Sequence, residues 1–151
     1  RDAWGAPEWC AIEKSLDVIG TRSAMILLRE AFYGARRFDD LVRRTGLTET
    51  IAAKRLRELV QDGLLEQRPY REPGARTRKE YVLTDRGQAL FPLLVALMRW
   101  GQGLEGGGRG AEFLHAGCGA RLVPAVRCEA GHDVPIAEAE ARLAREAAPS
   151  A

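Results

Sequence analysis

The sequence predicts a mainly α-helical fold with one small β-hairpin, followed by a small ribbon-like tail. Three observations point to this fold class. Apolar residues recur at helical spacing over about the first 60 residues. The pattern then changes to two short strand-like runs on either side of the turn pair Pro73-Gly74. Further along, six glycines fall between Gly101 and Gly110, ahead of a segment that carries Cys and His.

The composition fits a soluble globular protein of one domain plus a small appendage. The chain has 151 residues, of which 29% are charged and 46% hydrophobic. The longest apolar run, residues 89–98, is about half the length of a membrane span, so we expect no membrane association. No basic-then-apolar leader opens the chain, and its 3 cysteines are too few for a secreted disulfide scaffold. We therefore expect a cytoplasmic, nucleoid-associated protein.

Two helices are predicted in the first part of the chain. The first opens at Pro7 and Glu8 and closes at Gly20, and the second runs from about Arg22 to Tyr33. Each carries an apolar stripe at helical spacing. The stripes consist of Ile12, Leu16 and Ile19 in the first helix, and of Met25, Leu28 and Phe32 in the second.

A helix-turn-helix pattern comes next. A short helix over residues 38–44 precedes the turn 45–47, in which Gly46 suits a positive φ. Thr48 is a plausible N-cap for a second helix, which reaches Asp62 and ends at Gly63.

The strands of the hairpin are expected at residues 64–70 and 78–83. Thr84 then caps a last long helix that runs through Trp100. This order of elements is that of a winged helix-turn-helix domain. It predicts a winged helix over residues 1–102, a Gly-rich linker over 103–112, and a Cys/His-containing tail over 113–151 that ends in a helix from Ile136 to Ala147.

Polar residues gather on one face of the second helix of the motif, opposite its apolar face. In a major groove, a cation on this face can donate to guanine, a hydroxyl can bind a base or phosphate, and a small residue can touch a thymine methyl. The alternative is an ordinary solvated helix face. The predicted contacts are Thr48 at the cap and Thr50, Ala53, Lys54 and Arg57 along the face, whereas Arg55 lies to the flank, where it can pair with an acid.

Basic residues also concentrate in the hairpin. Residues 1–103 carry 18 basic and 14 acidic side chains, a net charge of +4, whereas residues 104–151 carry 5 and 7, a net charge of −2. Cations on a projecting loop can bind phosphates or enter a minor groove, although they can also serve solubility alone. The candidates are Arg71, Arg76, Arg78 and Lys79 in the hairpin, with Arg36 and Arg37 just before the helix-turn-helix.

Six segments carry a family resemblance: CAIEKSLDVIG (10–20), ILLRE (26–30), RFDDL (37–41), RLREL (55–59), DGLLE (62–66) and EYVLT (80–84). Over about residues 8–102 the chain resembles the HxlR-type, MarR-like winged-helix transcriptional regulators. The resemblance implies a bacterial homodimer on a palindromic operator, with the first and last helices of the domain at the dimer interface and repression as the common mode. The sequence departs from the family at Ser23, where Trp is usual, and at Ala53, where Ser or Thr is common.

Cys10 is a candidate redox sensor. It is predicted in the first turn of the first helix, where backbone N–H groups can stabilise a thiolate. In the resembling family some members sense electrophiles or oxidants through a cysteine at this place. The alternative is a free cysteine that serves as a small buried hydrophobe.

The tail offers two ligand pairs for a metal: His115 with Cys118, and Cys128 with His132. Zinc takes such sets tetrahedrally, and a short tail would gain stability from it. Some relatives carry a zinc-ribbon-like tail, but Gly131 stands in place of its last Cys. Three alternatives stay open: a structural zinc, a metal-free ribbon, or a disulfide between Cys118 and Cys128.

We therefore expect a sequence-specific DNA-binding repressor that is a homodimer and is released by a redox or small-molecule signal. A cavity lined by Phe32, Phe91, Leu94 and Trp100 is a candidate ligand site, although core packing explains the same stripe. The alternative function is a protein-interaction module with the tail as its partner-binding element. Only two histidines and no nucleophile motif are present, so we expect no enzyme and no required cofactor.

Overall fold

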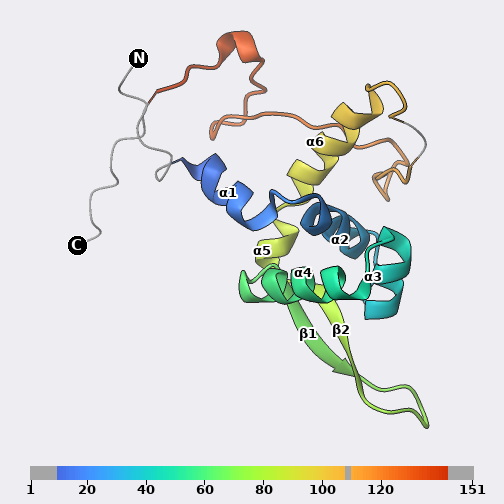
Figure 1. Ribbon diagram of the computed structural model, residues 1–151. Helices are drawn as coiled ribbons and strands as arrows, with labels where there is room; N and C mark the ends of the chain where they lie inside the picture. The colour runs from blue at the N-terminus through green and yellow to red at the C-terminus, as the bar shows by residue number, and fades with distance from the viewer. Residues whose placement is uncertain (1–9, 108–109, 143–151) are drawn as a thin grey trace.

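The computed structural model describes residues 10–107 and 110–142. Along the chain, helices come before and after one β-hairpin, which is the element order of a winged helix-turn-helix fold (Figure 1). The elements are α1 (Ala11–Ile19), α2 (Arg22–Phe32), α3 (Phe38–Thr45), α4 (Glu49–Gln61), β1 (Leu65–Tyr70), β2 (Arg78–Leu83), α5 (Asp85–Gln88), α6 (Phe91–Gln102) and a single 3₁₀ turn, η2 (Ile136–Glu138).

The core lies where α2 packs against α3 and α4, with the base of the hairpin beside them. Leucines at helical spacing supply it, because each helix turns one apolar stripe inward. Burying one such side chain stabilises the fold by about 2 kcal/mol. The largest fully buried side chains are Leu27, Leu28, Leu41, Leu56, Leu59 and Leu65.

Local signals set the helix boundaries as predicted. The Thr48 hydroxyl accepts a hydrogen bond of 3.3 Å from the Ile51 N–H, which caps α4. Gly46 adopts φ 68° at the end of α3, in the left-handed region that side chains disfavour. These two residues fix the turn between the helices of the motif.

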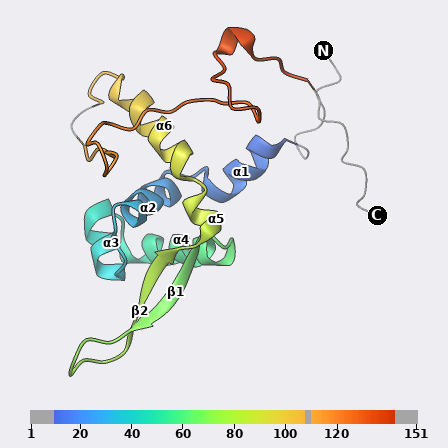
Figure 2. The same ribbon diagram turned by 180° about the vertical axis from the view of Figure 1, so that it is seen from behind.

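The hairpin is antiparallel, with Leu65 paired to Leu83 at its base and Tyr70 to Arg78 near its tip. Its base is fixed to the loop before α3, because the Tyr81 N–H donates to the Arg36 carbonyl at 2.8 Å. The hairpin is the wing. It projects beyond α4 on the side of the molecule opposite α1 and the tail, and the view from behind agrees (Figures 1 and 2).

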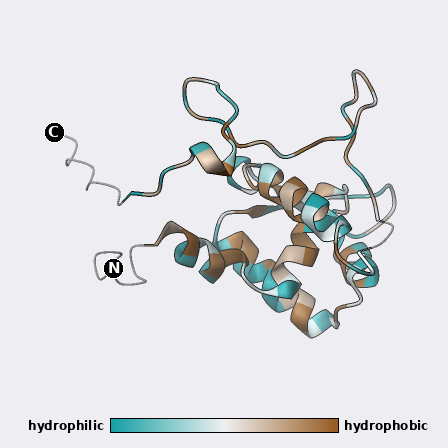
Figure 3. Ribbon diagram, turned by 90° about the horizontal axis from the view of Figure 1, so that it is seen from above, coloured by the Kyte–Doolittle hydropathy of each residue, from teal (hydrophilic) through white to brown (hydrophobic). Residues whose placement is uncertain are grey.

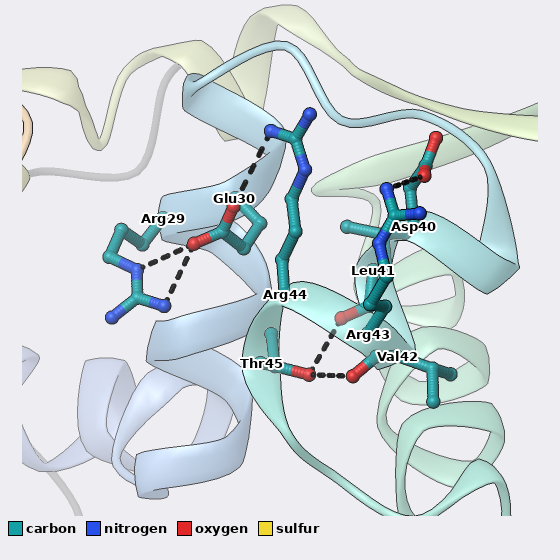
Figure 4. A network of polar contacts seen from close by, with 8 residues as sticks. All are labelled: Arg29, Glu30, Asp40, Leu41, Val42, Arg43, Arg44 and Thr45. Carbon is teal, nitrogen blue, oxygen red and sulfur yellow. Dashed lines mark hydrogen bonds and ion pairs between the residues drawn. The ribbon is translucent and has the colours of Figure 1, made fainter.

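Glu30 is the buried charged residue of the core region. Arg29 binds its carboxylate at 2.8 Å, and Arg44 of α3 approaches it at 3.8 Å (Figure 4). Thr45 donates to the Leu41 carbonyl at 2.7 Å in the last turn of α3. The pair between Glu30 and Arg44 therefore joins α2 to the first helix of the motif.

The predicted long last helix is wrong in one respect, because it is broken into α5 and α6. Thr84 does cap a helix: its hydroxyl accepts from the Gly87 N–H at 3.0 Å. That helix ends at Gln88, and α6 begins at Phe91 with Pro92 in its first turn. Proline has no N–H to donate to the preceding turn, which favours a new helix start over a continuous helix.

Two other boundaries differ from the prediction. Cys10 is not in the first turn of α1 but is its N-cap residue, in extended conformation, and the predicted start at Pro7 and Glu8 lies outside the described residues. The predicted helix from Ile136 is a single 3₁₀ turn, and residues 139–142 are not helical. Residues 143–147 of that prediction lie outside the described residues. A short isolated helix with no surface to pack on is only marginally stable.

The tail packs on the helices at Phe113 and forms two loops (Figure 3). Each loop is closed by one isolated bridge, Leu114 with Arg121 in the first and Arg127 with Asp133 in the second. The tail is therefore a pair of small turns, which matches the ribbon-like prediction. In the part of the chain described here, no helix is both long and apolar enough to cross a membrane.

Candidate nucleic-acid interface

The helix α4 separates an apolar from a polar face as the sequence predicts. Ala52, Leu56 and Leu59 are buried against the preceding helices. Thr50, Lys54 and Arg57 are exposed on the other side, and Ala53 between them is half-buried. The helix therefore presents a hydroxyl and two cations on its free face.

Two neighbouring residues on α4 have structural partners. Arg55 donates from Nε to the Ser23 hydroxyl at 2.9 Å and pairs with Glu58 at 2.6 Å, which confirms the predicted pairing with an acid. The Lys54 ammonium lies 4.0 Å from the same Glu58. Arg57 forms no ion pair with any described residue, so its guanidinium is free for a phosphate or a base.

Cations gather on the wing as predicted. Arg71 donates to the Ala75 carbonyl at 3.2 Å, which holds its side chain across the turn at the wing tip. Arg76, Arg78 and Lys79 are exposed, and within the described ranges none of them has a carboxylate partner. The wing tip and its second strand are therefore a positively charged surface suited to phosphates.

Arg36 and Arg37, which the sequence predicts as phosphate contacts, each form an ion pair with a glutamate of the hairpin. Arg36 lies 3.6 Å from a carboxylate oxygen of Glu80. Arg37 donates to Glu72 in a short ion pair, and its guanidinium lies 4.8 Å from the centre of the Tyr70 ring. The hydrogen bond to Glu72 holds the pKa of Arg37 above its ordinary value. The pair therefore joins the start of α3 to the wing.

The sequence pattern did not identify the partners of these arginines. Glu72 is the one acid in the basic stretch from Arg68 to Lys79, and this isolation is a usable signal for an internal ion pair. The pairing of Glu80 with Arg36 depends on the contact between the wing and the loop before α3, which local periodicity does not report.

Cys10 is exposed at the N-cap of α1, with no side-chain hydrogen bond to the helix. Its thiol is accessible to a reagent or an oxidant. Exposure fits a sensor better than the alternative of a buried small hydrophobe.

The four candidate zinc ligands form two separate pairs. The His115 Nδ1 lies 3.2 Å from the Cys118 sulfur, and the Cys128 sulfur lies 3.6 Å from the His132 Nδ1. Among the described residues no three metal-binding side chains come together. The residues thus form two half-sites in one chain, and a four-ligand zinc site stays a prediction.

Cys128 differs from an ordinary thiol. Backbone N–H groups of His132 and Ala130 donate to its sulfur and lower its pKa. Gly131, at φ 88°, allows the turn that points these groups at the sulfur. Cys118 and Cys128 are both free and exposed, and no disulfide joins them.

The stripe proposed as a ligand cavity is mostly packed. Phe32 and Phe91 lie 5.7 Å apart, Leu94 is buried, and Trp100 points to solvent. A pocket of about 390 Å³ lies between the end of α2, β2 and the start of α6, and two of the predicted residues, Phe32 and Phe91, line it together with Arg36 and Tyr81.

Comparisons with known proteins agree with this geometry. The profile of the HxlR-like helix-turn-helix family matches residues 18–106. An uncharacterized HTH-type transcriptional regulator of Mycobacterium tuberculosis is 36% identical over 120 residues, which cover 78% of this chain and 75% of the relative. An uncharacterized HTH-type regulator of Methanothermobacter thermautotrophicus is 33% identical over 67% of this chain and 77% of its own length. Both relatives are named as HTH-type transcriptional regulators.

Two solved structures are also similar. PA1607, described as a candidate transcription factor, has a TM-score of 0.77 and 33% identity, and the match covers 91% of this chain and 96% of that one. The redox regulator HypR in its oxidized form has a TM-score of 0.57 and 31% identity over 64% of this chain and 98% of that one.

Proposed function

Because the chain belongs to the HxlR-like helix-turn-helix family of DNA-binding transcriptional regulators, we propose that it is a repressor that binds a palindromic operator as a homodimer. The observation that carries this proposal is the position of the exposed α4 face next to the cationic wing. A protein that binds the chromosome of a bacterium acts in the cytoplasm, on the nucleoid.

The two parts of the interface suit different grooves. Lys54 and Arg57 on α4 can donate to guanine in the major groove, Thr50 can bind a base or a phosphate, and Ala53 is small enough to approach a thymine methyl. Thr48 is occupied as a cap, so its contact with DNA is limited to the backbone at the start of the helix. The wing cations can follow a minor groove or its phosphates.

A homodimer is supported by apolar side chains that the single chain leaves in water. Ile12 and Leu16 on α1, and Leu93, Leu97 and Trp100 on α6, are exposed. The helices that carry them, α1 and α6, lie on the side of the molecule opposite the wing (Figure 1). Pairing through this side places the two α4 helices on one face of DNA, where half-sites about 34 Å apart are required.

The signal that releases DNA has two candidates. Cys10 is exposed on α1, which belongs to the proposed dimer interface, and the similar HypR is a redox regulator. An oxidant that joins or modifies Cys10 would shift α1 and, through the dimer, the spacing of the α4 helices. The pocket beside Phe91 offers a small-molecule route to the same movement.

The interface is tested by mutation. Lys54→Ala with Arg57→Ala should weaken operator binding by at least about 30-fold, since each cation contributes about 1–3 kcal/mol at a specific contact. The control variant Arg121→Ala with Arg142→Ala removes the same charge from the tail and should keep operator affinity. Equal affinity of both variants would contradict the interface.

The alternative, a protein-interaction module with the tail as the binding element, gives a different result. Such a module would show no specific DNA binding and would be indifferent to both Lys54 and Arg57. The large apolar exposure of the tail is the observation that favours it.

A further inference from the structure

The tail, residues 110–142, carries apolar side chains without a core of its own. Val123 is 67% exposed, Val126 is 70% exposed and Ile136 is 93% exposed. Its two turns are held by backbone hydrogen bonds, such as the 2.9 Å bond from the Val134 N–H to the Val126 carbonyl. Local bonds alone do not compensate for leaving such side chains in water, so the segment requires another surface.

The tail is attached to its own chain at its start. The Phe113 ring lies 5.0 Å from Phe91 of α6 in an edge-on arrangement and 5.5 Å from Tyr33. Leu122 also touches the α6 side, since it lines a small pocket with Val95 and Met98. Beyond Leu122 the tail runs along the molecule on the α1 and α6 side, opposite the wing (Figures 1 and 2).

An open apolar groove lies between α6 and this part of the tail. It has a volume of about 720 Å³. Leu93 and Ala96 line it from α6, and Val123, Pro124 and Val126 line it from the tail.

The chain exposes more surface than a compact monomer of the same mass. The accessible surface is 12087 Å², whereas a compact monomer of 16.6 kDa exposes about 7,600 Å². The 20 residues outside the described ranges account for at most about 3,200 Å², the value for a fully extended chain. An excess of roughly 1,300 Å² remains, which exceeds the about 800 Å² that each partner buries in a standard interface.

The charge of the tail argues against nucleic acid as the covering surface. Arg121 pairs with Glu112 at 3.2 Å, and Arg127 pairs with Asp133 at 2.7 Å, so each turn neutralises its own arginine. Residues 110–142 carry 3 basic and 5 acidic side chains, a net charge of −2. A phosphate backbone would be repelled by this segment.

We infer that the tail is an arm that holds a second copy of this chain, and that the groove between α6 and residues 122–126 receives α1 of that copy. The inference rests on the homodimer proposed above and extends its interface from the helices to the tail. A second copy is the fitting occupant because α1 offers the matching feature: Ile12, which is 71% exposed, and Leu16 one turn later. In a two-fold dimer each copy gives one arm and receives one.

Sedimentation equilibrium of the full chain tests the arm. Val123→Glu with Val126→Glu should raise the dimer dissociation constant by at least about 100-fold, because two valines are lost from each of two symmetric contacts. The control Ala116→Glu with Ala130→Glu adds the same charge within the two turns and should leave the constant unchanged. Circular dichroism should match the wild type in both variants, since the substituted side chains are exposed. The unfolding midpoint should fall in the valine variant alone, because a weaker dimer stabilises the native state less.

Photo-cross-linking identifies the segment of the second copy that the groove contacts. Benzoylphenylalanine at position 126 of an untagged copy, mixed with a tagged wild-type copy, should yield cross-linked pairs that map to residues 11–19 of the tagged chain. Cross-links confined to the same chain, or a dimer constant that the Val123 and Val126 substitutions do not change, would overturn the arm. If the wild type is monomeric and binds no operator, the proposed function fails as well, so the two failures are distinguishable.

Discussion

The guanidinium of Arg55 on α4 donates a hydrogen bond of 2.9 Å to the hydroxyl of Ser23 on α2. This contact connects the DNA-facing helix to the helix behind it. Ser23 stands where the resembling family usually has Trp, so a polar contact here replaces apolar packing. Glu58 holds the other side of the same guanidinium at 2.6 Å, which fixes the side chain of Arg55 beneath the free face of α4.

Removing this contact should lower stability without removing a DNA contact. Arg55→Ala should reduce the free energy of unfolding by about 1–3 kcal/mol, and Ser23→Ala by about 1 kcal/mol, because partly buried hydrogen bonds are lost. The double variant should cost less than the sum, since both remove one bond. Urea unfolding measures all three values. Fully additive effects would show that the two side chains act independently.

Glu30 should be essential to the position of α3. It is buried and lies between Arg29 and Arg44, as Figure 4 shows. Glu30→Gln should lower the free energy of unfolding by about 1.5 kcal/mol, because the buried side chain loses its charge-assisted hydrogen bond while the half-exposed arginines stay solvated. Asp40→Asn, which breaks the exposed pair with Arg43, should cost less than about 1 kcal/mol. Thermal unfolding compares the two variants, and equal losses would contradict the role of Glu30.

Glu72 should restrain DNA binding. Its carboxylate forms an ion pair with the Arg37 guanidinium at the wing. Glu72→Ala would leave that cation free to bind a DNA phosphate. We expect tighter binding, and a salt dependence that is steeper by about one phosphate contact. The control Glu129→Ala removes the same charge from the tail. A gain that is equal in both variants would reflect net charge alone.

Cys128 should react with alkylating reagents at lower pH than an ordinary thiol. Backbone N–H groups of His132 and Ala130 stabilise its thiolate and lower its pKa, so the reactive form is present below the ordinary value and is lost as the pH falls through the lowered one. The measurement is the pH dependence of iodoacetamide labelling in a Cys10→Ser, Cys118→Ser background. Gly131→Val disturbs the positive-φ turn and should move the midpoint back up. An unchanged midpoint would show that the turn does not set the pKa.

The features that the sequence predicted well depend on neighbours in the chain. Thr48, Gly46 and the apolar stripe of α4 act within one or two helical turns, so spacing alone locates them. The break between α5 and α6 also has a local signal, Pro92. The apolar run over residues 89–98 suggested one continuous helix instead, so the break was not predicted.

The features that the sequence did not reveal depend on distant partners. Glu72 lies 35 residues from Arg37, and Phe113 of the tail reaches Tyr33 and Phe91. Periodicity carries no record of such pairings. The helix predicted from Ile136 failed for a related reason: its residues favour a helix, but within residues 136–142 no surface of the chain packs against it.

The most direct test is the affinity of the protein for the DNA upstream of its own gene, measured from about 50 to 200 mM salt. We predict specific binding. The logarithm of the association constant should fall linearly with the logarithm of the salt concentration, with a slope that corresponds to several phosphate contacts per dimer. The same titration with a thiol oxidant should show release in the wild type and not in Cys10→Ser if Cys10 carries the signal. Absence of specific binding, or affinity that does not change with salt, would contradict the assignment of α4 and the wing as a DNA interface.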